Sequence, residues 1–540
     1  MALEPIQAGA WSLVPALVAI TLAWYTRDAL IGLFVGVSIT GVVYGALRPA
    51  AVGVPGDIAG STAGEVLGAI FGLKTIPTLV ATAPLFADAW YIENVLLAVF
   101  AIGGLIGLMI RSGAIRGVLE ALTARANSAA DAEKAAFIAG IAIHIDDYFN
   151  CLVVGSMMRP LTDRFDVSRA KLAYYVDSAG SPAARLAFYS TWGAAMVGFI
   201  GAGLVAAAQQ GTLPPGMSNY VSGSGNEAEA VTQQVWPLFF NTLFTAFYSW
   251  IALILAALVA WQVVPNMFGM RKEEERARRG DGVVGEDDSP MISEEMKQYE
   301  MYEGATPDWR NFAVPIATMI VVGVGAMLWR DGPVVTSVGG AFALDIGGVR
   351  LGLAATTAMV VAFVLYRLRG DIPSNSDGTD AMIKGMKGIF LAAVILALAT
   401  SIQNAVTTLG ISSFVTDWFG GVPAAIIPVT VFLLTAFISF SDGSSWSTYG
   451  IMFPIAIPVA FVTGANLPLV LGAVFSGGIF GDHCSPISDT TVLASSTSGS
   501  DHMVHVRTQI PYAVTTAAIA AVLFLLAGFL LPEGFRVIPY

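Results

Sequence analysis

Long apolar runs separated by short polar breaks follow one another along almost the whole chain. A helix needs ~20 apolar residues to cross a bilayer, and many of the runs approach that length. They cover 11–24, 29–47, 92–110, 235–264, 310–329, 349–366, 381–400, 421–440, 448–463, 467–480 and 510–531. Residues 50–90 are rich in Gly, Pro and Thr, which suits a short or re-entrant helix. Because a β-barrel would show short alternating segments instead, the pattern predicts an all-α polytopic membrane protein.

Dense polar clusters interrupt three of these apolar regions, at 144–150, 177–182 and 481–491. The last holds two carboxylates, an imidazole, a thiol and several hydroxyls, and its Pro486 lacks the N–H that would continue a helix. Broken backbone at membrane depth is tolerated only where it is buried in protein or lines a cavity. Charged side chains at that depth mark functional sites. We therefore expect these clusters to form an ion or substrate site.

Short sequence matches recur in the same order in the two halves of the chain. The matched pairs are Val14-Pro15 with Val314-Pro315, Gly113 with Gly410, Asp147 with Asp442, and Ser181-Pro182 with Ser485-Pro486. Secondary transporters are often built from inverted-topology repeats whose broken helices meet at the bilayer midplane. We expect a first repeat at 1–265, a polar acidic linker loop at 266–308 and a second repeat at 309–540. The repeat predicts that 144–191 faces 442–496.

Composition agrees with a membrane protein and excludes several other classes. The chain has 540 residues, is 55% hydrophobic and only 12% charged, with a net charge of −12, whereas soluble domains carry roughly 25% charged residues. Much of the acidic excess lies in the linker, and nucleic-acid binding would need a basic face. The basic residues within 271–279 favour a cytoplasmic linker. Cys151 and Cys484 lie in apolar sequence, which argues against a structural disulfide.

The expected helix breaks lie at Ser181-Pro182 in the first half and at Ser485-Pro486 in the second. Oxygen-bearing side chains at these breaks are suited to a sodium ion, which prefers oxygen ligands and is bound where helices are broken. Asp177, Ser178 and Ser181 form one candidate set, and the mirrored set is Asp482, Ser485, Asp489 and Thr490. A carboxylate that binds either H⁺ or Na⁺, but never both, is the minimal device for exchange. Asp177 and Asp482 are the leading Na⁺ ligands. The alternative for each acid is a helix cap that accepts backbone N–H bonds.

Asp146 and Asp147 are adjacent acids, so on a helix they point about 100° apart. Asp147 aligns with Asp442, and we expect both of these to face the site. Asp146 would then face the site only if the helix unwinds, or it would pair with a cation. The candidate cations are Arg159, Arg185 and Arg507.

Histidine titrates near neutral pH, so His144 and His483 are candidates for a proton relay. The alternative is a neutral buried imidazole that holds one hydrogen bond. His502 and His505 lie near an expected membrane edge and are interpreted as surface residues. The spacing of His483-Cys484 and these two histidines matches no standard zinc pattern.

Arg185, three residues after the second polar cluster, is a permanent cation, and two roles are open for it. It could neutralise Asp147, Asp177 or Asp482, or its planar fork could bind a substrate carboxylate. Trp192 could help to wall an organic-substrate site, although a packed core tryptophan is more common.

The polar clusters together resemble the NhaC-type Na⁺/H⁺ antiporter family. The matching stretches are 144–150, 154–163, 171–178, 480–491, 495–496, 501–502, 505–508 and 511–512. The resemblance implies inverted repeats with re-entrant hairpins, an elevator-type carrier, commonly a homodimer, in the cell (inner) membrane. The family usually has Thr-Ala-Ala-Pro after the Asp-Ser pair, whereas this chain has 179–182 as Ala-Gly-Ser-Pro, followed by Arg185.

These observations together predict a secondary transporter that exchanges Na⁺ for H⁺, with no cofactor and no enzymatic activity. The alternative is a Na⁺- or H⁺-coupled carrier of a small carboxylate or amino acid, with Arg185 on the carboxylate. No nucleotide-binding Gly-rich loop and no nucleophile elbow is present, which argues against an ATP-driven pump and a hydrolase. The expected partners are the two ions, membrane lipid and a second copy of the chain.

Overall fold

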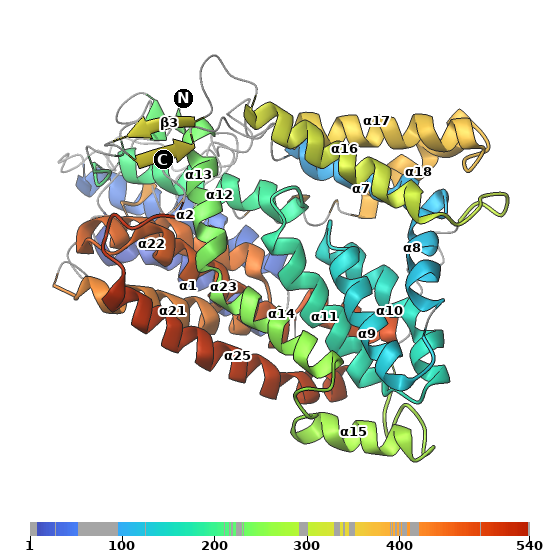
Figure 1. Cartoon of the computed structure of the whole chain (residues 1–540). Helices are drawn as coiled ribbons and strands as arrows, with labels where there is room; N and C mark the ends of the chain where they lie inside the picture. The colour runs from blue at the N-terminus through green and yellow to red at the C-terminus, as the bar shows by residue number, and fades with distance from the viewer. Residues whose placement is uncertain are drawn as a thin grey trace, which may run out of the picture.

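A computed structural model of the chain consists almost entirely of helices (Figure 1). It describes residues 8–26, 29–51, 96–124, 126–209, 211–214, 217, 220–222, 229–230, 232–290, 301–328, 335–338, 341–344, 351–388, 421–486 and 488–537, with isolated positions in 390–410. The predicted segment at 50–90 lies almost wholly outside the described residues, and so does the turn at 27–28.

The helices of the first half and of the linker are as follows: η1 (Gly9–Leu13), α1 (Val14–Thr26), α2 (Ala29–Ala51), α7 (Ala98–Arg111), α8 (Ala114–Thr123), α9 (Ala129–Ala142), α10 (Asp147–Arg164), α11 (Arg169–Leu186), α12 (Thr191–Gln209), α13 (Thr232–Thr245), α14 (Phe247–Ala260) and α15 (Phe268–Arg278). Those of the second half are α16 (Trp309–Leu328), α17 (Leu351–Arg369), α18 (Asn375–Gly388), η7 (Ala424–Ile426), α21 (Ile427–Asp442), α22 (Ser445–Thr463), α23 (Leu467–Cys484), α24 (Asp489–Ser498) and α25 (His502–Leu530). Two antiparallel hairpins complete the described elements: β1 (Val221–Ser222) with β2 (Glu229–Ala230), and β3 (Val335–Val338) with β4 (Ala341–Leu344).

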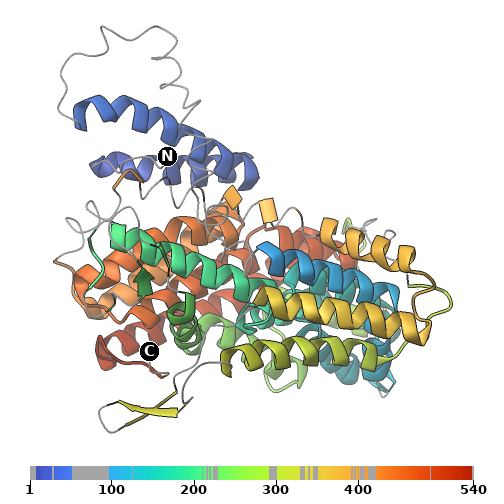
Figure 2. The same ribbon diagram turned by 90° about the horizontal axis from the view of Figure 1, so that it is seen from above.

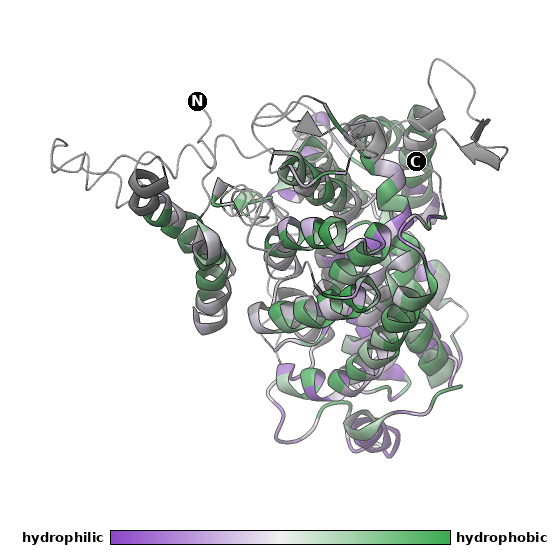
Figure 3. Cartoon of the chain, turned by 90° about the vertical axis from the view of Figure 1, so that its left-hand side faces the viewer, coloured by the Kyte–Doolittle hydropathy of each residue, from purple (hydrophilic) through white to green (hydrophobic). Residues whose placement is uncertain are grey.

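The length and apolar character of these helices confirm an all-α membrane protein. Among the described residues, six helices are long and apolar enough to span a bilayer, or up to seven if the pair α13 and α14, bent by 45°, counts as one span. Figure 3 shows apolar residues throughout the helical body, while hydrophilic residues gather on the linker helix α15 at the bottom of the view. Large apolar side chains are exposed along α25 and α21, for example Phe529 at 67% and Phe437 at 68%. Exposed apolar faces of this kind suit contact with lipid.

The helices form three groups that differ in their packing. α7, α16, α17 and α18 pack side by side at one edge, and α1 pairs with α2 as a layer that stands apart at another edge (Figure 2). Between these groups lie α9–α14 and α21–α25, which hold the polar breaks. One apolar core surrounds α12, α22 and α23, and a second joins α7, α9, α10, α11 and α17.

The two sets α9–α12 and α21–α24 have the same order of helices and breaks. α9 packs on α11 as α21 packs on α23, and α10 packs on α24 as α22 packs on α12. The last helix of each set, α12 or α24, therefore packs against the second helix of the other set, as expected for two structural repeats. The predicted facing of 144–191 and 442–496 is confirmed by the contacts of α10 and α11 with α24.

Candidate ion-binding site

Two helix breaks in mirrored positions bring the polar clusters together. α23 ends at Cys484 and α24 begins at Asp489, so a break separates them where the sequence predicted it, and Ser488 caps α24 by accepting from the Thr491 amide. The first-half break lies at 187–190, so its predicted position at Ser181-Pro182 was wrong. Pro182 is tolerated inside α11, and Arg185 lies before the break rather than after it.

Arg185 lies at the centre of the site and is fully buried. Its Nη2 forms an ion pair with Asp482, donates to Ser445 Oγ at 2.8 Å and lies 3.4 Å from Asp147 Oδ2. Ser445 Oγ and Ser488 Oγ donate to the two oxygens of Asp482, at 2.7 and 2.8 Å. A buried charge needs such compensation. The ion-pair role predicted for Arg185 is thus present, and Asp147 does face inward.

Aromatic rings cover one side of the guanidinium. Arg185 Cζ lies 4.0 Å from the ring centroid of Trp192, which stacks on Trp446 with 4.3 Å between centroids. A cation over an indole face is attracted by the ring quadrupole. Within the part of the chain that the structure describes, Arg185 Nε and Nη1 have no acceptor. The cation therefore keeps donor capacity beyond its ion pair.

Asp177 is the second buried acid, and its two oxygens differ. Its Oδ2 accepts from Gln509 Nε2 at 2.6 Å and from Thr491 Oγ1 at 3.2 Å. Its Oδ1 is buried and has no partner among the described residues, and the same holds for Ser181 Oγ. Positions four apart on a helix share a face, so these two oxygens lie on one side of α11. Thr491 Oγ1 also contacts the Asp482 carbonyl at 3.0 Å, which joins the two halves.

The remaining predicted residues have varied surroundings. Ser485 and Thr490 are buried at the second break, and Thr490 Oγ1 lies 3.4 Å from Asp482 Oδ1. Asp442 ends α21 and Asp489 begins α24, but their side chains lie outside the described residues. For Asp146, pairing with an arginine was one of two alternatives. Its Oδ2 accepts from Thr191 at 2.8 Å, and the residue lies just before α10, while Arg185 lies against Asp147.

The four histidines have different environments. His483 is buried, with Nε2 2.7 Å from Ser178 Oγ and Nδ1 2.8 Å from the Tyr248 hydroxyl. His144 lies at the α9–α10 break and contacts Tyr189 at 2.6 Å. The expectation that His505 is a surface residue was wrong, because it is fully buried, and His502 is partly buried.

A buried ionic cluster beside the linker was not foreseen. Glu133 accepts from Lys171 Nζ at 2.7 Å and from Arg278 Nη2 at 2.7 Å, and Lys171 lies 3.7 Å from Glu274. The linker helix α15 is thereby tied to α9 and α11. Pairing between residues so far apart in the chain has no local sequence signal.

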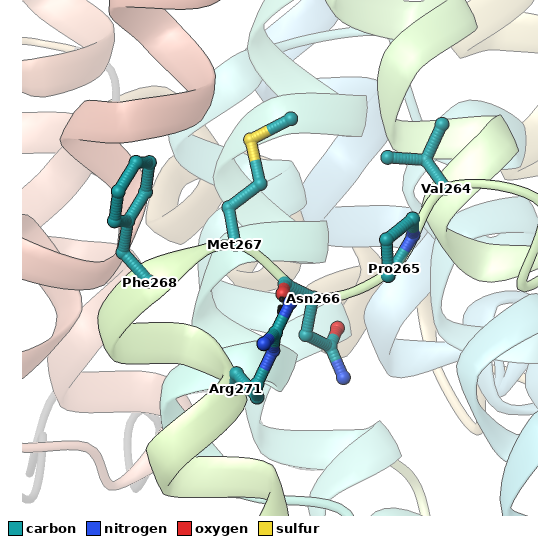
Figure 4. A pocket seen from close by; sticks show the side chains of 6 residues that line it. All are labelled: Val264, Pro265, Asn266, Met267, Phe268 and Arg271. Carbon is teal, nitrogen blue, oxygen red and sulfur yellow. Dashed lines mark hydrogen bonds between the residues drawn. The ribbon is translucent and has the colours of Figure 1, made fainter.

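A cavity of about 390 Å³ lies at the start of the linker (Figure 4). Its walls are formed by Val264, Pro265, Asn266, Met267, Phe268 and Arg271. It follows the C-terminal end of α14, whereas Tyr248 contacts the site near the N-terminal end of that helix. The cavity is therefore separate from the polar breaks.

Polar helix breaks inside an apolar helical body, with buried acids at their centre, define the class of secondary transporters. Comparison with known proteins agrees. The Na⁺/H⁺ antiporter family matches residues 211–529. An uncharacterized protein of Haemophilus influenzae is 30% identical over 98% of this chain and 93% of its own length. The chain belongs to the Na⁺/H⁺ antiporter family and is a multi-pass protein of the cell membrane, not an enzyme.

Partial matches extend to relatives with named activities. The malate-2H⁺/Na⁺-lactate antiporter of Bacillus subtilis is 34% identical over 26% of this chain and 32% of its own length. The Na⁺/H⁺ antiporter NhaC of Alkalihalophilus pseudofirmus is 30% identical over 28% of this chain and 32% of its own length. The resemblance to NhaC-type antiporters is thus confirmed. The YdaH transporter of Alcanivorax borkumensis, 17% identical, shares the fold with a TM-score of 0.58 over 93% of this chain and 99% of that one.

Proposed function

We propose that this protein exchanges Na⁺ for H⁺ and that the carboxylate of Asp177 binds the two ions in turn. The observation that carries the proposal is the pair of buried oxygens, Asp177 Oδ1 and Ser181 Oγ, which have no partner among the described residues. Sodium prefers such oxygen ligands, and transporters bind it where helices are broken. Both residues lie within the continuous helix α11, and Asp177 faces the second-half break through its contact with Thr491 on α24. A proton on the same carboxylate would remove the charge that attracts the cation.

Charge balance supports Asp177 over Asp482 as the exchanging acid. Asp482 is compensated by Arg185 and by the hydroxyls of Ser445 and Ser488. Asp177 receives only neutral donors in the described contacts, from Gln509 and Thr491. An ionised carboxylate in a buried setting is costly without a cation, so Asp177 has the greater need of Na⁺ or H⁺. Asp482 would act as a Na⁺ ligand only if Arg185 moved away.

The test is Na⁺-driven proton movement in proteoliposomes loaded with a pH-sensitive dye. The wild-type protein should move protons when Na⁺ is added alone, and Asp177→Asn should move none. Glu120→Gln is the control, since Glu120 is 54% exposed and lies outside the site. Proton movement in Asp177→Asn at the wild-type rate would contradict the proposal.

A second candidate function is coupled transport of a small carboxylate, and Arg185 favours it. Its Nε and Nη1 keep N–H donors without acceptors in the described structure, and Trp192 covers the guanidinium. A carboxylate would supply those acceptors. The partial match to a malate/lactate antiporter agrees with this possibility. A dye response that requires malate or lactate in addition to Na⁺ would favour this second function, and Arg185→Gln should then abolish that response.

A further inference from the structure

A chain of hydrogen bonds joins the start of α25 to Asp177. His502 Nδ1 and His505 Nδ1 lie 3.0 and 2.8 Å from one atom, Ser495 Oγ on α24. His505 Nε2 lies 2.7 Å from Gln509 Oε1, and Gln509 Nε2 lies 2.6 Å from Asp177 Oδ2. His505 is fully buried, so its own contacts are made away from bulk water, whereas His502 is partly buried.

Donors and acceptors in this series of hydrogen bonds can be assigned from the groups at its two ends. Gln509 Nε2 faces two acceptors, Asp177 Oδ2 and the carbonyl of His483, so the amide oxygen faces His505. His505 Nε2 must therefore carry a hydrogen. His502 Nε2 must carry one as well, because its partner 2.7 Å away is the carbonyl of Pro486.

The two Nδ1 atoms then compete for the single hydrogen of Ser495. If both imidazoles are neutral, both Nδ1 atoms need a donor and only one can receive the Ser495 hydrogen. The Thr491 carbonyl also lies 2.7 Å from Ser495 Oγ, but as the i−4 carbonyl in α24 it faces the helix amide of Ser495 and does not need the hydroxyl hydrogen. One additional proton relieves the shortage. Placed on Nδ1 of either histidine, it is donated to Ser495 Oγ, and the Ser495 hydroxyl donates to the other Nδ1. Buried polar groups strongly favour such satisfied arrangements.

We propose that His502, Ser495 and His505 form a proton-binding site that holds one shared proton and acts on Asp177 through Gln509. The proton moves when His502 Nδ1–H passes its hydrogen to Ser495 Oγ while the Ser495 hydroxyl passes its own to His505 Nδ1. The positive charge then lies on His505, and no hydrogen is gained or lost. The functional part of the proposal rests on the exchange of Na⁺ and H⁺ at Asp177.

Neighbouring charged groups are compatible with a cation here. Asp501 caps α25 beside His502 by accepting from the Val504 amide at 3.0 Å, and its carboxylate favours an imidazolium. His483 on α23 contacts Gln509 through its carbonyl, while its ring is held by Ser178 on α11 and Tyr248 on α14.

Further charged groups on the elements packed against α25 include two sets of ion pairs. Glu274 on the linker helix α15 and Lys171 on α11 belong to the cluster with Glu133 and Arg278, which holds two acids and two bases. Asp482 on α23 is paired with Arg185 on α11. Asp177 on α11, joined through Gln509, is thus the acid that the shared proton acts on from within the protein.

Charge on His505 has a defined effect on Asp177. An imidazolium strengthens the donation to Gln509 Oε1, which polarises the amide and strengthens its donation to Asp177, because hydrogen bonds in a chain reinforce one another. The ionised carboxylate, which is the form that binds Na⁺, is thereby favoured. The site would keep Asp177 available to Na⁺ when protons are abundant.

The first experiment measures the shared proton directly by ¹⁵N NMR of imidazole-labelled protein in nanodiscs. The chain has only four histidines, and His144→Gln, His502→Gln and His505→Gln give the assignments. At pH 7 the signals of His502 and His505 should report one imidazolium between them, or exchange between imidazolium and neutral forms. Ser495→Ala should give two independent titrations. Two neutral imidazoles in the wild-type protein at pH 7 would overturn the proposal, whether or not the protein exchanges Na⁺ for H⁺.

The second experiment measures the apparent KM for Na⁺ in proteoliposomes as a function of pH. His505→Gln should raise the KM for Na⁺ about 3- to 10-fold at pH 6.5, because a change of one unit in the pKa of Asp177 changes its proton affinity tenfold. At pH 8.5 the same variant should raise KM less than about 2-fold. Met503→Ala on the same turn, with Met503 44% exposed, is the control. An equal rise at both pH values would indicate a purely structural role and would contradict the link to Asp177. If the wild-type protein does not exchange Na⁺ for H⁺ at all, the proposed function is refuted instead.

Discussion

The buried ionic cluster at Glu133 gives a stability prediction whose size follows from the structure. Glu133 is fully buried and accepts from Lys171, from Arg278 and, at 2.9 Å, from the Tyr175 hydroxyl. Glu133→Ala would leave the Lys171 ammonium, 2% exposed, with Glu274 at 3.7 Å as its remaining ion-pair partner among the described residues. Removing one member of a buried ion pair costs about 3–5 kcal/mol, because the other charge loses its compensation.

The measurement is reversible unfolding in mixed detergent micelles, followed by tryptophan fluorescence. Glu133→Ala should lower the free energy of unfolding by about 3–5 kcal/mol. Glu120→Ala is the matched control: its pair with Arg116 spans one helical turn, and both side chains are 54% exposed. An exposed pair of this kind contributes about 0.3–0.5 kcal/mol. Replacing Glu133 and Lys171 together by Leu and Met should restore much of the loss, because apolar residues replace buried pairs with little cost.

The contrary result is equally clear. A loss for Glu133→Ala of no more than about 1 kcal/mol, the range of exposed pairs, would mean that water reaches Lys171 and that the cluster does not hold the linker helix. A double variant as unstable as Glu133→Ala alone would show that the lost stability does not come from the orphaned charge.

Other changes give distinct outcomes. Asp482→Asn removes the charge that balances Arg185 and should abolish transport while lowering the thermal midpoint in detergent; normal transport would remove Asp482 from the mechanism. Gly385→Val would place its Cβ 2.0 Å from the Gly103 carbonyl oxygen, so α7 and α18 must separate. The variant should lower the free energy of unfolding by about 1–3 kcal/mol in the same unfolding assay. An unchanged free energy of unfolding would contradict the close contact between these helices. Burial raises the pKa of Asp501, but backbone N–H donors from the linker and from the first turn of α25 outweigh it and hold that pKa below its usual value. The ionised carboxylate of Asp501 therefore stabilises the fold fully above ~pH 3.9, and this stabilisation is lost as the pH falls through its lower folded pKa. The difference in melting temperature between the wild type and Asp501→Ala should shrink toward about pH 3. A difference that does not depend on pH would contradict this.

The sequence was sufficient to locate the buried acids of the site. Asp147, Asp177 and Asp482 interrupt apolar runs, and such interruptions are costly enough to mark function. Their mirrored order also predicted which segments meet. Gln509 and Thr491, which hold Asp177, were not singled out, because a neutral polar residue carries little signal, even in the case of Thr491 inside the polar cluster at 481–491.

The failures have physical causes. Pro182 was expected to break α11, but proline is tolerated in membrane helices when neighbouring groups satisfy the freed carbonyl. His505 was expected at the surface because α25 was predicted to start later, at 510, whereas it begins at His502 and extends the buried helix by two turns. The partners of Lys171 come from α9 and from the linker, and no local pattern could reveal that pairing.

Proton release on Na⁺ binding tests the central claim, the alternation of two ions at Asp177, most directly. Purified protein in lightly buffered detergent solution is mixed with NaCl near neutral pH, and a pH indicator counts the protons released, with choline chloride as the salt control. The wild-type protein should release protons in a saturable manner, and Asp177→Asn should release none. Release of the same size from Asp177→Asn would contradict the account.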